Sequence, residues 1–141
     1  MLDLSTATRD WSAKPVAIAP LAGVVDDDES VRDALSSFIR SLGYRCVVFS
    51  SAESFLSSGD LRNTDCTVLD VRMPGLSGLE LQQKLRELNC PVPIIFVTGL
   101  ADDHVRASAL KEGAVAVLNK PFSEEALLGA LDSVLNSSRN Q

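Results

Sequence analysis

Five polar side chains follow short apolar runs of this 141-residue chain. Asp26, Asp27, Asp70 and Thr98 continue directly from such runs, and Lys120 stands one residue beyond another. If the runs are parallel strands, these side chains meet at the carboxyl-end edge of one sheet, where open α/β sheets bind ligands. Three carboxylates, a hydroxyl and an ammonium can hold a divalent cation beside a reactive carboxylate. The pattern therefore predicts a carboxylate that accepts a phosphoryl group.

The apolar runs alternate with longer segments of helical periodicity, which is typical of repeated βα units. The strands are expected at Leu21–Val25, Cys46–Phe49, Cys66–Leu69, Ile94–Val97 and Val115–Leu118. Because these runs are almost wholly apolar, helices should cover both faces of the sheet. The predicted fold class is α/β with a five-stranded parallel sheet.

Helix boundaries are marked by capping residues and glycines. Ser50 with Glu53, and Ser77 with Glu80, have the spacing of capping boxes before the second and third helices. Gly113 should end a fourth helix that spans roughly 102–112.

Composition excludes several classes of function. A net charge of −6 argues against a nucleic-acid-binding surface, because phosphate backbones are bound by an excess of Lys and Arg. No apolar run approaches the ~20 residues that span a bilayer. Residues 1–20 do not resemble a secretory signal, so a cytoplasmic location is expected. Cys46, Cys66 and Cys90 lack metal-binding spacing and should be reduced, buried thiols.

Four segments together resemble the receiver domain of two-component response regulators. They are Val24-Val25-Asp26-Asp27-Asp28, Leu69-Asp70-Val71-Arg72-Met73-Pro74-Gly75, Val97-Thr98-Gly99 and Lys120-Pro121-Phe122. The resemblance implies a flavodoxin-like (βα)5 fold with strand order 2-1-3-4-5. We expect the receiver domain at 20–136, between a flexible tail at 1–19 and a short tail at 137–141.

The resemblance assigns the metal and phosphoryl chemistry to particular residues. Asp70 would be the phosphoacceptor. Asp27 and Asp70 would bind Mg²⁺ (or Mn²⁺) directly, the Arg72 backbone carbonyl would add a third oxygen, and Asp26 would act mainly through water. Without the ion, crowded carboxylates repel one another, which should raise at least one pKa.

The remaining site residues would contact the phosphoryl group. By resemblance, Thr98 donates its hydroxyl to a phosphoryl oxygen, and the backbone of Gly99 and of Val71 contacts the group. Lys120 would pair with Asp70 before transfer and with a phosphoryl oxygen afterwards, and its bond to Pro121 would be cis.

Single residues of the site also allow simpler interpretations. Asp70 could merely begin a turn, Thr98 with Gly99 could end a strand, and Lys120 could be a solvated charge. These interpretations fit each motif alone, but not four motifs in order. Asp28, in contrast, is expected only to cap a helix.

Three rival classes share parts of the pattern. A haloacid-dehalogenase-type hydrolase would carry an acid two residues after its nucleophile, where this chain has Arg72. A flavin binder would need a Ser-, Thr- and Gly-rich first loop instead of three aspartates. A binding module of the same fold that needs no phosphate remains open, because Val117 stands where receivers commonly carry a switching Tyr or Phe.

The resemblance implies a signalling switch with only its own phosphotransfer and slow hydrolysis, rather than a metabolic enzyme. A sensor histidine kinase would be its partner, and a homodimer could form through the fourth helix, fifth strand and fifth helix. Neither nucleic acid nor membrane is expected to bind directly. The signal could pass by protein contact, or to a helix-turn-helix domain of a longer regulator.

Overall fold

The computed structural model describes residues 18–99 and 102–136. The strands are Leu21–Val25 (β1), Arg45–Phe49 (β2), Cys66–Leu69 (β3), Ile94–Thr98 (β4) and Ala116–Asn119 (β5). The helices are Glu29–Ser41 (α1), Ala52–Leu56 (α2), Gly78–Glu87 (α3), Asp103–Lys111 (α4) and Glu124–Leu131 (α5). A 3₁₀ turn over Leu61–Asn63 and a π-helical turn over Asp132–Asn136 complete the described elements.

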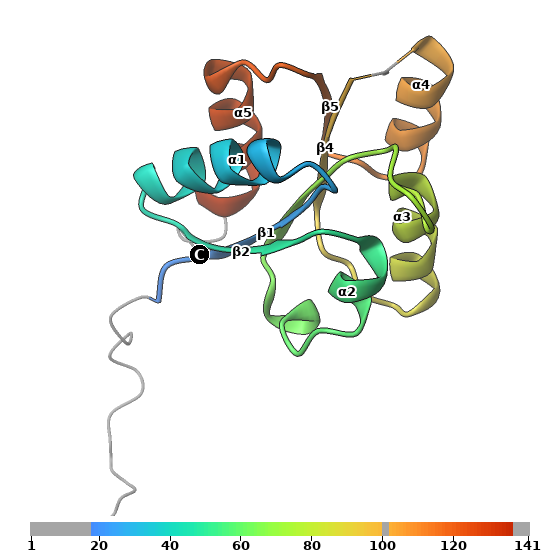
Figure 1. Cartoon of the computed structure of the whole chain (residues 1–141), viewed down its shortest axis with the longest axis horizontal. Coiled ribbons are helices and arrows are strands. Elements are labelled where there is room, and N and C mark those ends of the chain that lie inside the picture. The colour runs from blue at the N-terminus through green and yellow to red at the C-terminus, as the bar shows by residue number, and fades with distance from the viewer. Residues whose placement is uncertain (1–17, 100–101, 137–141) are drawn as a thin grey trace, which may run out of the picture.

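The strands form one parallel sheet in the order β2-β1-β3-β4-β5. Figure 1 shows α1 and α5 on one face of this sheet, and α2, α3 and α4 on the other. This arrangement confirms the predicted α/β class, the five parallel strands and the strand order. The carboxyl ends of all five strands therefore point toward the same edge.

Successive side chains of each strand point to opposite faces of the sheet, and so they form two separate hydrophobic cores. In β4, Ile95 and Val97 pack with the α1 and α5 side, whereas Ile94 and Phe96 pack with the α2, α3 and α4 side. Because both faces are covered, every residue of β1, β3 and β4 is buried.

Strand and helix boundaries agree with the sequence prediction to within about one residue at most ends. The capping box at Ser77 and Glu80 is present. The box predicted at Ser50 is wrong, because Ser51 caps α2 and accepts from the amide of Ser54. Glu53 cannot close that box, since its carboxylate accepts from the amide of Leu76 instead.

The three cysteines are free and buried, as predicted. Burial raises the pKa of the Cys66 thiol to about 12, so this thiol stays protonated at neutral pH. No helix in ranges 18–99 and 102–136 is long and apolar enough to cross a bilayer. Except for Ile18 and Ala19, the predicted tails at 1–19 and 137–141 lie outside the described residues.

Candidate functional site

Backbone hydrogen bonds carry the sheet ladder one residue past the ends of three strands. The amide of Asp26 donates to the Phe49 carbonyl at 3.1 Å, and the amide of Asp70 donates to the Val25 carbonyl at 3.0 Å. The amide of Lys120 donates to Thr98 at 2.9 Å. The backbone of the residues that follow these strands is therefore fixed by hydrogen bonds that continue the sheet.

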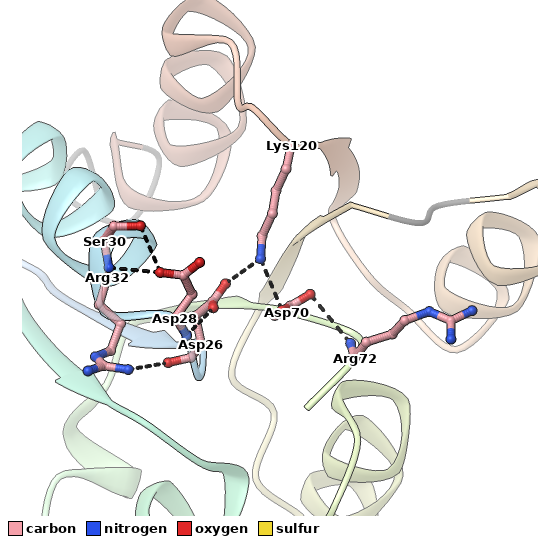
Figure 2. Close-up of polar contacts among 7 residues, drawn as sticks. All are labelled: Asp26, Asp28, Ser30, Arg32, Asp70, Arg72 and Lys120. Carbon is pink, nitrogen blue, oxygen red and sulfur yellow. Dashed lines mark hydrogen bonds and ion pairs between the residues drawn. The ribbon is translucent and has the colours of Figure 1, made fainter. Parts of the chain in front are cut away.

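The side chain of Lys120 joins two of the carboxylates at this edge. Its Nζ lies 2.9 Å from Asp26 Oδ2 and 3.0 Å from Asp70 Oδ2. Figure 2 shows the lysine reaching from the end of β5 across to Asp26 and Asp70. The Lys120–Pro121 bond is cis, as the resemblance implies. Both carboxylates are almost fully buried, so their negative charge needs this cation.

The loop that follows β1 is held by its own hydrogen bonds. The amide of Asp28 donates to Asp26 Oδ1 at 2.9 Å, and the Asp28 carboxylate caps α1 by accepting from Ser30. Asp28 is therefore a helix cap, as predicted. Arg32 donates to the Asp26 carbonyl at 2.9 Å (Figure 2), a contact that the sequence analysis missed. An arginine on a helix resembles any surface charge in sequence, so no pattern marked it.

The surroundings of Asp26 raise the pKa of its carboxyl group above that of an exposed aspartate. Burial is the largest cause that raises the pKa of Asp26, and the nearby charge of Asp70 raises it further. Hydrogen bonds from Asp28 and Lys120 oppose this shift without cancelling it. The predicted rise in a carboxylate pKa is confirmed, although burial contributes more than repulsion. Burial lowers the pKa of Lys120, but its bonds to Asp26 and Asp70 raise it more.

The donor set suits a hard divalent cation. One carboxylate oxygen from each of Asp26, Asp27 and Asp70 lies within 4.8 Å of the others, and Asp27 is exposed to solvent. Oxygen ligands and access for water are what Mg²⁺ requires, since it keeps part of its hydration shell. Arg72 continues the chain two residues after Asp70, and its amide lies 3.4 Å from Asp70 Oδ1. Its backbone is thus close to the same carboxylate.

Thr98 presents a buried hydroxyl beside this cluster. Its side chain is fully buried, and within the described part of the chain its Oγ1 has no hydrogen-bond partner. A buried hydroxyl without a partner is costly, and Thr67 within β3 has another among the described residues. The next residue, Gly99, is exposed, and a Cβ added there would have no described heavy atom within 4 Å. This end of β4 therefore has room for a ligand.

The loop after Asp70 depends on a glycine that the sequence analysis did not single out. A Cβ on Gly78 would lie 2.1 Å from the Asp70 carbonyl oxygen, so any larger residue would force the backbone there to move. The Gly78 amide also donates to the Val71 carbonyl at 2.8 Å. A glycine just after a helix cap is a weak signal in sequence, because only the fold brings it against Asp70.

Val117 is buried on the face of the sheet that packs against α2, α3 and α4. It pairs with Phe96 in the sheet register, while Thr98 pairs with Asn119. Arg106 of α4 donates to the Val117 carbonyl at 2.5 Å. Arg106 therefore links α4 to the backbone of β5 at Val117. The side chain at this position of β5 is a valine and not an aromatic residue.

Comparison with known proteins matches this geometry to one family. The sequence model described as the response regulator receiver domain matches residues 23–132. The chain is 47% identical over 118 residues to the response regulator protein TmoT of Ectopseudomonas mendocina, covering 84% of this chain and 54% of that protein. It is 45% identical over 140 residues to nodulation protein W of Bradyrhizobium diazoefficiens, covering 96% of this chain and 62% of that protein.

A solved structure of the response regulator StyR has a similar fold. It superposes with a TM-score of 0.78 at 42% identity, covering 87% of this chain and 63% of that one. The chain thus spans between half and two thirds of the length of these relatives.

Proposed function

The chain belongs to the response regulator receiver domain family, and from this premise we propose that Asp70 accepts a phosphoryl group from a sensor histidine kinase in a Mg²⁺-dependent reaction. Receivers of this family are signalling switches. The observation that carries the proposal is the buried carboxylate of Asp70 with the Lys120 ammonium at 3.0 Å, at the sheet edge where Thr98 ends β4. Phosphoryl transfer needs positioning and charge stabilisation more than acid–base chemistry, and this cluster offers both.

In the proposed reaction, a carboxylate oxygen of Asp70 attacks the phosphorus of a phosphohistidine on the kinase. A P–O bond forms while the P–N bond breaks, and the imidazole nitrogen keeps the electron pair of that bond. The almost complete burial of Asp70 limits access of water to the acyl phosphate that results.

Asp26, Asp27, Asp70 and the Arg72 carbonyl would hold Mg²⁺, and Mn²⁺ could replace it. When bound, the ion neutralises the crowded carboxylates and the phosphoryl oxygens. Lys120 would exchange its contact with Asp70 for one with a phosphoryl oxygen. Thr98 would donate its hydroxyl to another, and the backbone of Val71 and Gly99 would contact the group.

The proposed output is a change in the α4, β5 and α5 face. An aspartyl phosphate carries about two negative charges where the free carboxylate carries one, and this change must bias an element with two arrangements to act at a distance. Leu110 of α4 and Leu128 of α5 are exposed apolar residues that a second copy could cover in a homodimer. With Val117 in place of an aromatic residue, the signal would pass through repacking of α4 against β5.

The proposal is tested by intact mass after incubation with acetyl phosphate and Mg²⁺. We expect the wild-type chain to gain one phosphoryl group, and the Asp70→Asn variant or a sample with chelator to gain none. Modification of Asp70→Asn to the same extent would show that another residue is the acceptor.

A second candidate function is a binding module of the same fold that works without phosphate, and the buried Val117 favours it. This candidate predicts no gain of mass and no spectral change when beryllofluoride and Mg²⁺ are added. Either response in the wild type would exclude it.

A further inference from the structure

Glu53 of α2 contacts the loop that follows Asp70. The amide of Leu76 donates a 2.9 Å hydrogen bond to Glu53 Oε2, across 23 residues of sequence. We propose that Glu53 is a positioning residue for the metal site, because it holds the 71–77 loop in the conformation in which the Arg72 carbonyl can bind the cation. The inference rests on the proposed function, since it presumes that the Arg72 carbonyl is a ligand of Mg²⁺.

The base of this loop is held by α3. The Gly78 amide bonds the Val71 carbonyl at 2.8 Å, and Gly78 packs directly against the Asp70 carbonyl. These contacts bring the two ends of the loop together. They leave the segment between Arg72 and Leu76 to be held by other contacts.

Glu53 supplies such a contact at Leu76, the last residue of this segment. Gly75 has a positive φ of +76°, and a Cβ added there would lie 2.7 Å from Glu53 Oε2. The carboxylate therefore lies close against the backbone at Gly75 and bonds the amide of the next residue. A loop held at its base and near its tip has fewer conformations, so the Arg72 carbonyl needs less ordering when a cation binds.

The carboxylate of Glu53 is suited to hold the loop at neutral pH. The hydrogen bond from the Leu76 amide is the main cause that lowers the pKa of Glu53, so the carboxylate is ionised and accepts strongly. Among the described residues, the carboxylates close enough to share a cation are Asp26, Asp27 and Asp70. Glu53 thus acts through the loop and not as a ligand.

The test is the affinity of the full chain for Mg²⁺ alone, measured by calorimetric titration. We expect Glu53→Ala to weaken binding about tenfold, which is the low end for residues that orient metal ligands. Hydrogen exchange of the Leu76 amide should be faster in this variant. Glu87→Ala, which removes an exposed carboxylate at the end of α3, is the control and should bind as the wild type does.

Two further variants separate the hydrogen bond from the charge. Glu53→Gln keeps an acceptor oxygen and loses the charge, so it should bind Mg²⁺ nearly as well as the wild type. Glu53→Asp keeps the charge but is one methylene shorter, so it should resemble Glu53→Ala. The opposite ranking of these two variants would show that only long-range charge matters, and it would overturn the inference.

The remaining outcomes are also decisive. If the wild type binds Mg²⁺ and Glu53→Ala binds it equally well, the positioning role is wrong while the proposed function stands. If the wild type binds no Mg²⁺, the proposed function and this inference fail together. Because Glu53 is exposed, its substitution should leave the fold intact, and circular dichroism of each variant checks this.

Discussion

Asp26 and Lys120 show how single residues set the balance between stability and function at this site. Asp26 is 1% exposed and has a raised pKa, whereas Lys120 is held charged by the two carboxylates that it joins. In a protein without a metal ion, an ionised Asp26 is less favourable in the folded state than in the unfolded chain. In the proposed Mg²⁺ site the same carboxylate would face a cation, which would favour its ionised form.

We predict that Asp26→Asn unfolds at higher urea concentration than the wild type at pH 7 without Mg²⁺. Because the folded-state pKa of Asp26 is raised, its proton stabilises the folded state, and this stability is lost as the pH rises through that pKa. The advantage of the variant should therefore shrink as the pH falls from 7 toward the ordinary Asp value of 3.8.

The control for this prediction is Asp33→Asn, which removes the same charge from an exposed position on α1. The stabilities of the wild type and of the two variants are measured by unfolding in urea, monitored by circular dichroism. An advantage of Asp26→Asn that stays constant with pH, or that Asp33→Asn shares, would contradict the explanation by burial.

At the scale of elements, the loop between β3 and α3 joins the start of a helix to the backbone of Asp70. Ser77 and Glu80 form the capping box that starts α3, and Gly78 follows the cap directly. The first turn of α3 therefore packs against the backbone of Asp70 with no intervening side chain. The start of α3 and the backbone of Asp70, the proposed phosphoacceptor, are therefore fixed by the same contact.

We predict that Gly78→Ala lowers the free energy of unfolding by about 1–3 kcal/mol, the usual cost of forcing an extra group into a packed site. It should also weaken Mg²⁺ binding, because the Asp70 carbonyl and the loop must move. Urea unfolding and calorimetric titration measure the two effects.

Gly129→Ala in α5 is the matched control. A Cβ there meets no described atom within 4 Å, so alanine should stabilise the helix by roughly 0.5–1 kcal/mol. If both substitutions had the same effect, close packing at Gly78 would not be the cause.

At the scale of the whole molecule, five βα units bring residues that are almost a hundred positions apart to one sheet edge. Asp26 follows the first strand and Lys120 the fifth, yet Asp26 Oδ2 and Lys120 Nζ lie 2.9 Å apart. A cation held by Asp26, Asp27 and Asp70 would therefore join the ends of β1 and β3. Its binding should stabilise the entire domain.

We predict that Mg²⁺ at about 100 times its dissociation constant stabilises the domain by about 2.7 kcal/mol, because only the folded chain assembles the site. Thermal unfolding with Mg²⁺, and again after chelation, measures the effect. Asp27→Asn should lose most of it, since this residue supplies an exposed carboxylate of the cluster. An equal shift in sodium chloride of the same ionic strength would contradict specific binding.

The fold class, most element boundaries and the set of polar residues at the sheet edge could be predicted from local sequence patterns. Apolar runs, helical periodicity and caps such as Ser77 are local signals, because each depends on neighbours within a few residues. Parallel strands then carry the residues that follow them to one edge, as with Asp26, Asp70 and Lys120.

Contacts between separate βα units could not be predicted from the sequence and are seen in the three-dimensional structure alone. The role of Glu53 is an example, since its sequence spacing suggested a capping box while its carboxylate bonds Leu76 in another unit. The need for glycine at position 78 and the raised pKa of Asp26 also depend on what packs nearby. Loop conformation and burial set these contacts, and neither has a periodic pattern that a sequence could reveal.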